Sequence, residues 1–428
     1  MSERTAVDTA SSASASSKKE APSSIIDVTL ANGLRFVGER LERSQGVALA
    51  LRLQAGTKDD PGNKFGLAHL VKETLFKGTK KHDARELSDA FDFYGIRHSE
   101  YTGTESTTLQ LRFLPEHLEK ALSLIGEVLR EPSFPEDDCE TAKSQSLQEL
   151  KHLDDEPLSK VFVVLKELYF GSEWGHSELG TEKSLPGISR ADIKSFWKAH
   201  YIPAGTIVSA AGKFDPDTMI KLLEKLFVNT GPAWPLETPP KFAGIPVRTH
   251  LHKDSQQTQI AMAFPCVPRN DPSYYAVRTA VGALAGGMSS RLFTEVREKR
   301  ALVYSVGAQV ASLRGIGAVY VYAGTTAPRA AETLKVIQDE LKRLGEDLNK
   351  EEVDRAKIGF KAHMLMDQES TGARARELLD DIYFENRVVP VQEIVQRIDA
   401  VGLEDAKNYW NSHPFDPYAL VTLGRDPL

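Results

Sequence analysis

Residues 66–79 read GLAHLVKETLFKGT and have the period of an amphipathic helix. The apolar positions recur three and four residues apart and form one stripe, made of Leu67, Leu70, Val71, Thr74 and Leu75. The opposite face carries His69, Lys72, Glu73 and Phe76. A histidine followed four residues later by a glutamate directs two metal-ligand side chains to one point. The same pair is also common on solvated helix faces, so the spacing alone leaves both interpretations open.

Strand and helix patterns alternate on both sides of this helix. Alternating apolar residues predict a hairpin before it, formed by strands at 30–37 and 47–54. Further helices are predicted at 84–94, 115–130 and 136–152, and further strands at 107–114 and 206–212. The alternation lacks the regular strand–helix–strand crossovers of a parallel sheet. It therefore predicts an α+β fold with a largely antiparallel sheet.

A proline-rich segment divides the chain. Five prolines lie between residues 231 and 246, which is typical of a stiff, extended linker, here placed at 231–247. The earlier order then returns, with a strand at 258–264, a helix from Ser273, a hairpin of 302–311 with 318–324, helices at about 328–347 and 350–382, a last helix and a strand at 418–424. We therefore predict a disordered tail at 1–24 and two similar halves, 25–230 and 248–428. Each half is expected to be a mostly antiparallel or mixed sheet covered by helices.

The composition excludes several classes of protein. The 428 residues have a formal net charge of -7 that is spread along the chain, which argues against nucleic acid or an anionic membrane as the main partner. No apolar run approaches the roughly 18 residues of a membrane span. The N-terminus is rich in Ser and Ala and lacks the apolar core of a secretory signal. The two separate cysteines, Cys139 and Cys266, fit a reducing compartment, and we expect a cytoplasmic protein.

The stretch 66–79 resembles the signature helix of the pitrilysin/insulinase family, the inverted zincins. In that family the pattern H-x-x-E-H supplies two zinc-binding histidines and a glutamate that activates water. The flanks, residues 66–69 and 75–79, match the family almost letter for letter. The resemblance makes Glu149, 80 residues after His69, the counterpart of the family's third ligand. It also implies a clam-shell fold in which two α+β halves face each other.

The centre of the stretch departs from the family pattern. By position, Lys72 replaces the general-base glutamate and Glu73 replaces the second histidine, while Ser99 stands where the family usually has an asparagine. His69, Glu73 and Glu149 retain the number of ligands that zinc requires from a protein. A charged Lys72 cannot accept a proton from zinc-bound water, and its ammonium repels a dication at close range. We therefore expect no catalytic residue and no bound zinc or other cofactor in this chain, in which those three ligands are vestigial metal positions.

A second resemblance lies in residues 285–306, AGGMSSRLFTEVREKRALVYSV. In the family this segment places an arginine and a tyrosine against the substrate backbone from across the cleft, and by position these are Arg297 and Tyr304. Their spacing alone is typical of a solvated helix residue and an amphipathic strand residue. The resemblance implies a substrate-binding role, since a guanidinium suits a peptide carbonyl and a phenol can hold a developing oxyanion. Residues 176–185 also resemble the family, and the likeness runs from about Val28 to Leu423.

The broken metal motif and the intact Arg297/Tyr304 segment favour one function over two others. A non-catalytic subunit of a two-chain zinc peptidase would lend its substrate-binding groups to a homologous partner that carries the intact H-x-x-E-H motif and the zinc. Such pairs, of which the mitochondrial processing peptidase is one example, bind extended peptides in a shared chamber. The first alternative is a structural core protein of the same fold with no role in proteolysis. The second is an active peptidase with an atypical His/Glu/Glu site, and self-association in place of a heterodimer stays open.

Overall fold

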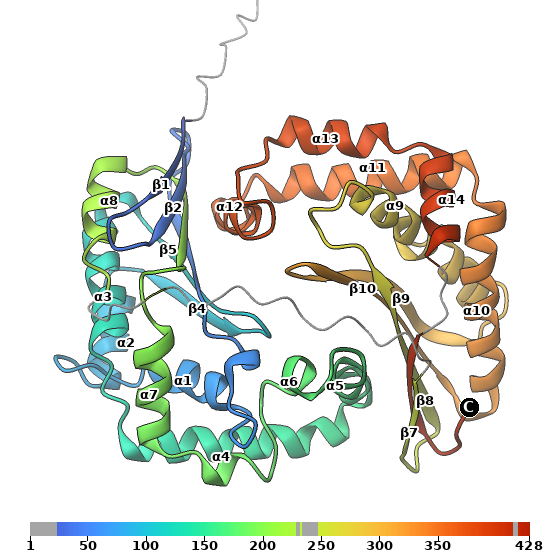
Figure 1. Cartoon of the computed structure of the whole chain (residues 1–428), viewed down its shortest axis with the longest axis horizontal. Helices are drawn as coiled ribbons and strands as arrows, with labels where there is room; N and C mark the ends of the chain where they lie inside the picture. The colour runs from blue at the N-terminus through green and yellow to red at the C-terminus, as the bar shows by residue number, and fades with distance from the viewer. Residues whose placement is uncertain (1–23, 228–231, 233–246, 414–417) are drawn as a thin grey trace, which may run out of the picture.

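The computed structural model describes residues 24–227, 232, 247–413 and 418–428. The chain forms two halves that face each other, each with a β-sheet and helices packed around it (Figure 1). The predicted tail 1–24, apart from Ser24, and most of the predicted linker 231–247 lie outside the described residues. Among the helices of the described ranges, none is both long and apolar enough to cross a lipid bilayer.

The first sheet has six strands in the order β1-β2-β6-β3-β5-β4. The strands are β1 (Ser24–Thr29), β2 (Arg35–Arg40), β3 (Val47–Leu53), β4 (Arg97–Thr102), β5 (Thr107–Phe113) and β6 (Ile207–Gly212). β2 and β6 are parallel, and all other neighbours are antiparallel. The helices of this half are α1 (Leu67–Leu75), α2 (Ala84–Phe93), α3 (Leu118–Arg130), α4 (Glu136–His152), α7 (Arg190–His200) and α8 (Pro216–Leu223). Strands and helices share one core, in which Leu49 and Leu51 of β3 meet Leu70 and Leu75 of α1.

The second sheet has five strands in the order β7-β11-β8-β10-β9. The strands are β7 (Val247–His252), β8 (Gln257–Cys266), β9 (Val303–Leu313), β10 (Ile316–Thr326) and β11 (Ala419–Gly424). The helices around it are α9 (Tyr274–Ala285), α10 (Ala330–Asp347), α11 (Lys350–Asp367), α13 (Val391–Ala400) and α14 (Leu403–Ser412). Their core includes Ile260 of β8, Val277 of α9, Ile337 of α10 and Trp410 of α14.

The two sheets have the same topology once β1 is left out. β2-β6-β3-β5-β4 corresponds strand for strand to β7-β11-β8-β10-β9, and each set has one parallel pair at the same place. This repeat confirms the predicted α+β fold of two similar halves. The predicted hairpin of 30–37 with 47–54 is wrong, because β6 lies between β2 and β3 and pairs with both. The single helix predicted at 350–382 is in fact two, because the Ser370 side chain caps a new helix that starts at Thr371.

The second sheet is covered on one face by a helix that ends more than seventy residues before the sheet begins. α5 (Pro157–Phe170) and the short α6 (Ser172–Gly175) belong to the first half in sequence, but they lie beside the second sheet (Figure 1). Val161 and Leu165 of α5 share a buried cluster with Ala263 of β8 and with other residues of that sheet. This helix is apolar on most of its surface, and the second sheet supplies the cover that it needs.

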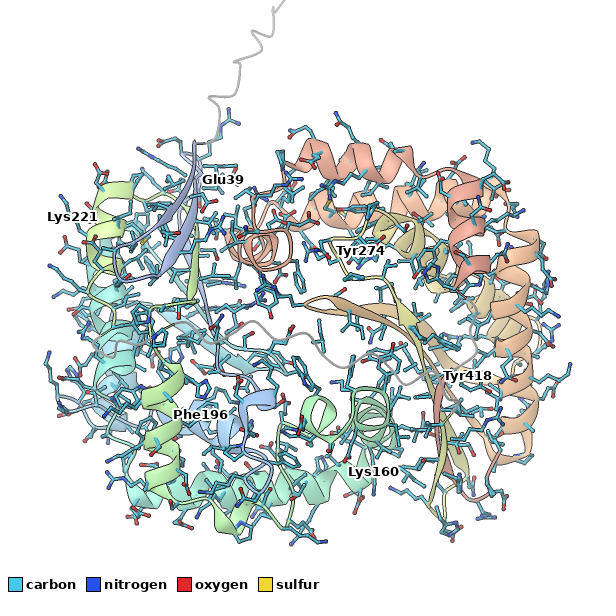
Figure 2. All side chains as sticks on the ribbon, viewed as in Figure 1. Glu39, Lys160, Phe196, Lys221, Tyr274 and Tyr418 are labelled. Atoms are coloured by element: carbon cyan, nitrogen blue, oxygen red, sulfur yellow. The ribbon has the colours of Figure 1, made fainter. Side chains whose placement is uncertain are left out.

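The first sheet receives a helix from the second half in return. α12 (Thr371–Glu385) lies against β2, β3 and β6, and its Leu378 and Ile382 pack on Val37 (Figure 1). Arg374 of α12 is buried and binds the carboxylate of Glu39 at 2.5 Å, and Figure 2 shows Glu39 on the strand next to this helix. The two halves therefore complete each other's cores and are held as one body.

Candidate functional site: the degenerate metal helix and the Arg297 segment

The start of α1 is fixed by a buried carboxylate. Asp60 accepts hydrogen bonds from the backbone N–H groups of Gly66 and Ala68, both at 2.7 Å. These groups are among the donors that a helix N-terminus leaves unpaired, and negative charge is stabilising there. The Nε2 atom of His176 lies 3.3 Å from the same carboxylate, and the His176 ring stacks on Phe65. Burial raises the pKa of Asp60, although the hydrogen bonds from His176 and the two backbone groups oppose the rise.

The loop 176–185 packs closely against this helix start. A Cβ atom on Gly180 would lie 2.2 Å from the carbonyl oxygen of Phe65, and one on Gly66 would lie 3.0 Å from the Cα of Gly180. Both glycines also have positive φ angles, +77° and +97°, which side chains rarely adopt. The hydroxyl of Ser184 donates to the Phe65 carbonyl at 2.7 Å. The two glycines therefore allow the loop to approach α1.

His69, Lys72 and Glu73 come together on α1. The Nζ atom of Lys72 is bonded to Oε1 of Glu73, and Nε2 of His69 lies 3.8 Å from the same oxygen. The Lys72 side chain is 15% exposed and that of Glu73 is 38% exposed. Burial, followed by the charge of Lys72, lowers the pKa of His69 to about 4, so this imidazole is neutral at pH 7. Burial tends to raise the pKa of Glu73, but the hydrogen bond and charge of Lys72 lower it overall, so Glu73 is an ion-paired carboxylate.

Further charged side chains surround this group. Glu178, in the loop 176–185, is exposed as a residue, yet partial desolvation of its carboxylate by neighbouring protein raises its pKa. The positive charges of Lys166 and Lys72 oppose this rise, whereas the negative charges of Glu149 and Glu73 add to it. Residues of α1, α4, α5 and the loop therefore act on one another electrostatically and form one cluster of mixed charge.

The donor set of this cluster does not fit a zinc ion. Within the described ranges, no three His, Cys, Asp or Glu side chains are grouped so that they could hold a metal ion. His69 and Glu73 are neighbours, but Glu149 is exposed on α4, where its charge acts on Glu178. The Lys72 ammonium is bonded to the Glu73 oxygen that is nearest to His69, and it would repel a dication at that point. That the chain binds no zinc in solution stays a prediction.

Arg297 and Tyr304 lie side by side in the second half. Arg297 belongs to a π-helical turn, Phe293–Glu298, a geometry that is found frequently at functional sites. Its guanidinium lies 4.8 Å from the centre of the Phe293 ring and 5.8 Å from the centre of the Tyr304 ring. Tyr304, at the start of β9, is 86% exposed, and Arg297 is also exposed. The two side chains are thus adjacent and accessible, while their binding of substrate stays a prediction.

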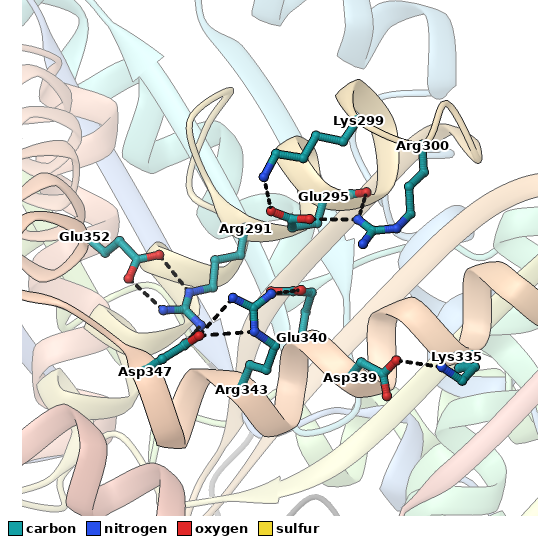
Figure 3. A network of polar contacts seen from close by, with 10 residues as sticks. All are labelled: Arg291, Glu295, Lys299, Arg300, Lys335, Asp339, Glu340, Arg343, Asp347 and Glu352. Atoms are coloured by element: carbon teal, nitrogen blue, oxygen red, sulfur yellow. Dashed lines mark hydrogen bonds and ion pairs between the residues drawn. The ribbon is translucent and has the colours of Figure 1, made fainter.

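Ion pairs lie just before the π-helical turn and within it. Arg291 is buried just before the turn and donates to both carboxylate oxygens of Glu352 at 2.7 Å and to Asp347 at 2.5 Å (Figure 3). Such a two-pronged arginine–carboxylate contact fixes orientation as well as distance. Within the turn, Glu295 binds Lys299 at 2.6 Å. Arg291 therefore anchors the start of the turn to α10 and α11.

Three residues of these sites have no signal in the sequence that marks their role. Asp60 lies six residues before the N-cap of α1 and carries no recognisable capping signal, because a capping residue normally stands next to its helix. Glu178 is a lone acid in a loop and has no periodic signal. Arg291 lies in the segment that resembles the family, but its partners Glu352 and Asp347 are more than fifty residues away.

The two facing halves and the modified H-x-x-E-H helix define a protein of the inverted zincin class. Residues 35–178 match the family described as Insulinase (Peptidase family M16), and residues 187–360 match the family described as Peptidase M16 inactive domain. The chain belongs to this peptidase family.

Individual relatives agree with that assignment over almost the whole chain. A Rickettsia felis protein named as an uncharacterized zinc protease is 28% identical over 385 residues, which cover 89% of this chain and 93% of that protein. YmxG of Bacillus subtilis, also named as an uncharacterized zinc protease, is 27% identical and covers 92% of this chain and 97% of its own length. The fold also matches the crystal structure of a peptidase M16 inactive domain from Pseudomonas fluorescens, with a TM-score of 0.87, 24% identity and coverage of 94% of this chain and 98% of that one. A protease from Helicobacter pylori has a TM-score of 0.85 at 21% identity, with coverage of 94% and 99%.

Proposed function

We propose that this chain is the non-catalytic subunit of a two-chain zinc peptidase. The observation that carries the proposal is the direct bond between Lys72 and Glu73, at the positions of the general base and the second zinc-binding histidine. A charged ammonium cannot take a proton from water, and a carboxylate that is already paired has little charge to offer a metal ion. The chain therefore lacks the groups for hydrolysis in its own first half.

The second half supplies the substrate-binding groups of the proposed subunit. Arg297 and Tyr304 are adjacent, exposed and carried by a turn that Arg291 anchors. A guanidinium can bind a peptide carbonyl or carboxylate, and a phenol can donate a hydrogen bond to a developing oxyanion. Their partner is a homologous chain that has an intact H-x-x-E-H motif and holds the zinc, so the working unit is a heterodimer.

The substrate class that we propose is an extended peptide. β4 and β9 are the edge strands of their sheets, and within the described residues each pairs with one neighbour. An edge strand presents unpaired N–H and C=O groups, to which an extended peptide can add as a further strand. β4 also contacts α1, so a peptide on this edge would lie next to the degenerate metal helix. We place the pair in the cytoplasm, because the two cysteines of this chain, Cys139 and Cys266, are free thiols, as is usual in a reducing compartment.

Reconstitution of peptidase activity tests the proposal. The purified chain is mixed with a homologous M16 chain from the same genome that has an intact motif, and cleavage of an unstructured fluorogenic peptide is followed. We expect the mixture to cleave far faster than either chain alone. Arg297→Ala and Tyr304→Phe should each lower the rate by roughly 10²–10³ if these groups stabilise the oxyanion. Lys342→Ala is the control, because Lys342 is an exposed cation of α10 that lies outside the turn.

The outcomes distinguish the proposal from its alternatives. If the Arg297 and Tyr304 variants activate the partner as fully as wild type, the substrate-contact role is wrong and the chain is a structural scaffold. If the chain alone cleaves the peptide and a chelator abolishes this activity, His69, Glu73 and Glu149 form a working metal site and the proposal fails.

A further inference from the structure

A cavity of about 530 Å³ lies in the second half between α9, α11, the loop 286–290 and β9. Its walls include Arg278 on α9, Arg355 and His363 on α11, and the strand residues 308–310. We propose that this cavity binds a carboxylate group of an extended peptide, supplied either by an acidic side chain or by the C-terminus of the peptide. The inference rests on the proposed function for the class of ligand, but direct binding tests it without a partner chain.

Arg278 is the central element of this site. Its guanidinium lies 4.4 Å from the centre of the Phe360 ring, and Nη1 reaches the hydroxyl of Tyr274 at 3.5 Å. Figure 2 shows Tyr274 at the start of α9. In the described part of the chain, no carboxylate forms an ion pair with Arg278, although this side chain is half-buried. A partly desolvated guanidinium that packs on rings and has free donors is well suited to a carboxylate ligand.

The remaining charges of the cavity do not neutralise Arg278. Glu352, the acidic residue of the lining, has both oxygens bonded to Arg291 at 2.7 Å. Arg355 donates to the carbonyl oxygen of Ser289 at 3.0 Å, and its carboxylate partner Glu351 is 86% exposed and so is well screened by water. The space between α9 and α11 is therefore positively charged within a chain whose net charge is negative.

The edge of β9 explains why the ligand should be an extended peptide. Residues 308–310 line the cavity, and β9 pairs with β10 on its other side. The backbone groups on the open side are available to a further strand, so a peptide that lies along them would border the cavity that Arg278 also lines. Met288, which is 78% exposed in the loop 286–290, offers an adaptable apolar contact at the rim of the cavity.

The cavity is also the topological counterpart of the degenerate metal site. α9 follows β8 as α1 follows β3, and β9 is the edge strand of its sheet as β4 is of the first. In the first half the cation on the helix, Lys72, is bonded to Glu73 of the same helix. In the second half the corresponding helix presents Arg278 to an open cavity. The same architecture thus provides a self-neutralised site in one half and a cationic site in the other.

Binding of short peptides to the isolated full chain tests this proposal. Three fluorescent peptides share one β-prone sequence: a neutral one with a central Gln and an amidated end, one with a central Glu, and one with a free C-terminal carboxylate. We expect at least one carboxylate peptide to bind roughly 10- to 100-fold more tightly than the neutral one, as for a charge-assisted hydrogen bond. The comparison of the two carboxylate peptides identifies the source of the group.

Variants assign the preference to Arg278. Arg278→Met removes the charge but keeps an unbranched side chain against Phe360, and it should abolish the preference for a carboxylate. Arg278→Lys keeps the charge but loses the fork of donors, and it should retain a weaker preference. Arg376→Met, an exposed arginine of α12, is the control and should leave the preference unchanged. Melting temperatures show which variants are folded. If Arg278→Met is unfolded, the carboxylate preference of Arg278→Lys relative to wild type is the test.

Three results would overturn the proposal: equal binding of all three peptides, binding of none, or an unchanged preference in the Arg278 variants. These results are independent of reconstitution. If activity with a partner fails but the carboxylate preference depends on Arg278, the cavity is a peptide site of a protein with another function. If activity is restored but the preference is absent, the chain is the proposed subunit and this cavity is not part of its substrate path.

Discussion

The ammonium of Lys72 is bonded to the carboxylate of Glu73, the side chain that stands in the place of a zinc-binding histidine. Both residues lie on the face of α1 that also holds His69, and the Lys72 side chain is mostly buried. The ammonium of Lys72 thus lies at the position where the family pattern binds a zinc ion. Lys72, at the position of the general base, is the counter-ion of Glu73, at the position of a metal ligand.

We expect the isolated chain to contain far less than one equivalent of zinc and to show no peptidase activity that a chelator abolishes. The reason is the positive charge of Lys72 beside the remaining donors, which disfavours a dication at that point. Elemental analysis of the purified protein and a peptide-cleavage assay with and without chelator check this. Stoichiometric zinc together with chelator-sensitive cleavage would contradict it.

Lys72→Met should lower the free energy of unfolding by about 1–3 kcal/mol at neutral pH. This lies between the small value of an exposed ion pair and the 3–5 kcal/mol of a buried one, because Lys72 is mostly buried whereas Glu73 is 38% exposed. Lys77→Met is the control, since Lys77 is an exposed lysine next to the same helix. Denaturant unfolding measures both, and equal stability of the two variants would show that the Lys72–Glu73 bond contributes little.

The double variant Lys72→Glu with Glu73→His restores the H-x-x-E-H pattern and should gain a zinc-dependent rise in melting temperature. A ligand that binds only the folded chain stabilises it by mass action, by about 2.7 kcal/mol at a hundred times its dissociation constant. The wild-type chain is the control and should not respond to zinc. A double variant that ignores zinc would mean that the exposed Glu149 cannot reach the repaired site.

Stability should also depend on Asp381, which is buried on α12. Burial raises the pKa of Asp381 to about 7, although the N–H of Val389 and the charge of Arg269 oppose the rise. Between pH 4 and pH 7 the folded chain therefore holds a proton that the unfolded chain releases, and the contribution of Asp381 to stability falls as pH rises through this window. The loss is up to roughly 4 kcal/mol. Asp381→Asn keeps an acceptor for Val389 and should flatten this part of the profile of unfolding free energy against pH, whereas parallel profiles for variant and wild type would contradict the assignment.

The features that the sequence predicts best are those that depend on a regular period of apolar residues or on a fixed spacing between two residues. The stripe of α1 is buried at all five predicted positions, because an amphipathic helix next to a sheet has one way to hide its apolar side. The spacing of Arg297 and Tyr304 also brings the two side chains together, since a short helical turn leads directly into β9. Both features depend on neighbours that are close in sequence.

Long-range pairing is what sequence does not reveal. The apolar residues of α5 show that this helix must be covered, but nothing in them identifies the second sheet as the cover. The same applies to Asp60, whose carboxylate caps a helix six residues away and meets His176 from a distant loop. Glu178 is similar, because burial raises its pKa in the folded chain and charges on three other elements oppose or add to that rise.

Because α12 covers the first sheet, one face of that sheet cannot be buried until α12 has left the ribosome, long after the strands themselves. The bond from Arg374 to Glu39 joins residues 335 positions apart, and contacts of such separation slow folding because a long loop must close before they form. During synthesis Val37 and Ala48 therefore lack the contacts that α12 supplies, and transiently exposed apolar surface of this kind favours aggregation. The same arrangement means that a gene truncated before α12 encodes neither half of the protein in a finished state.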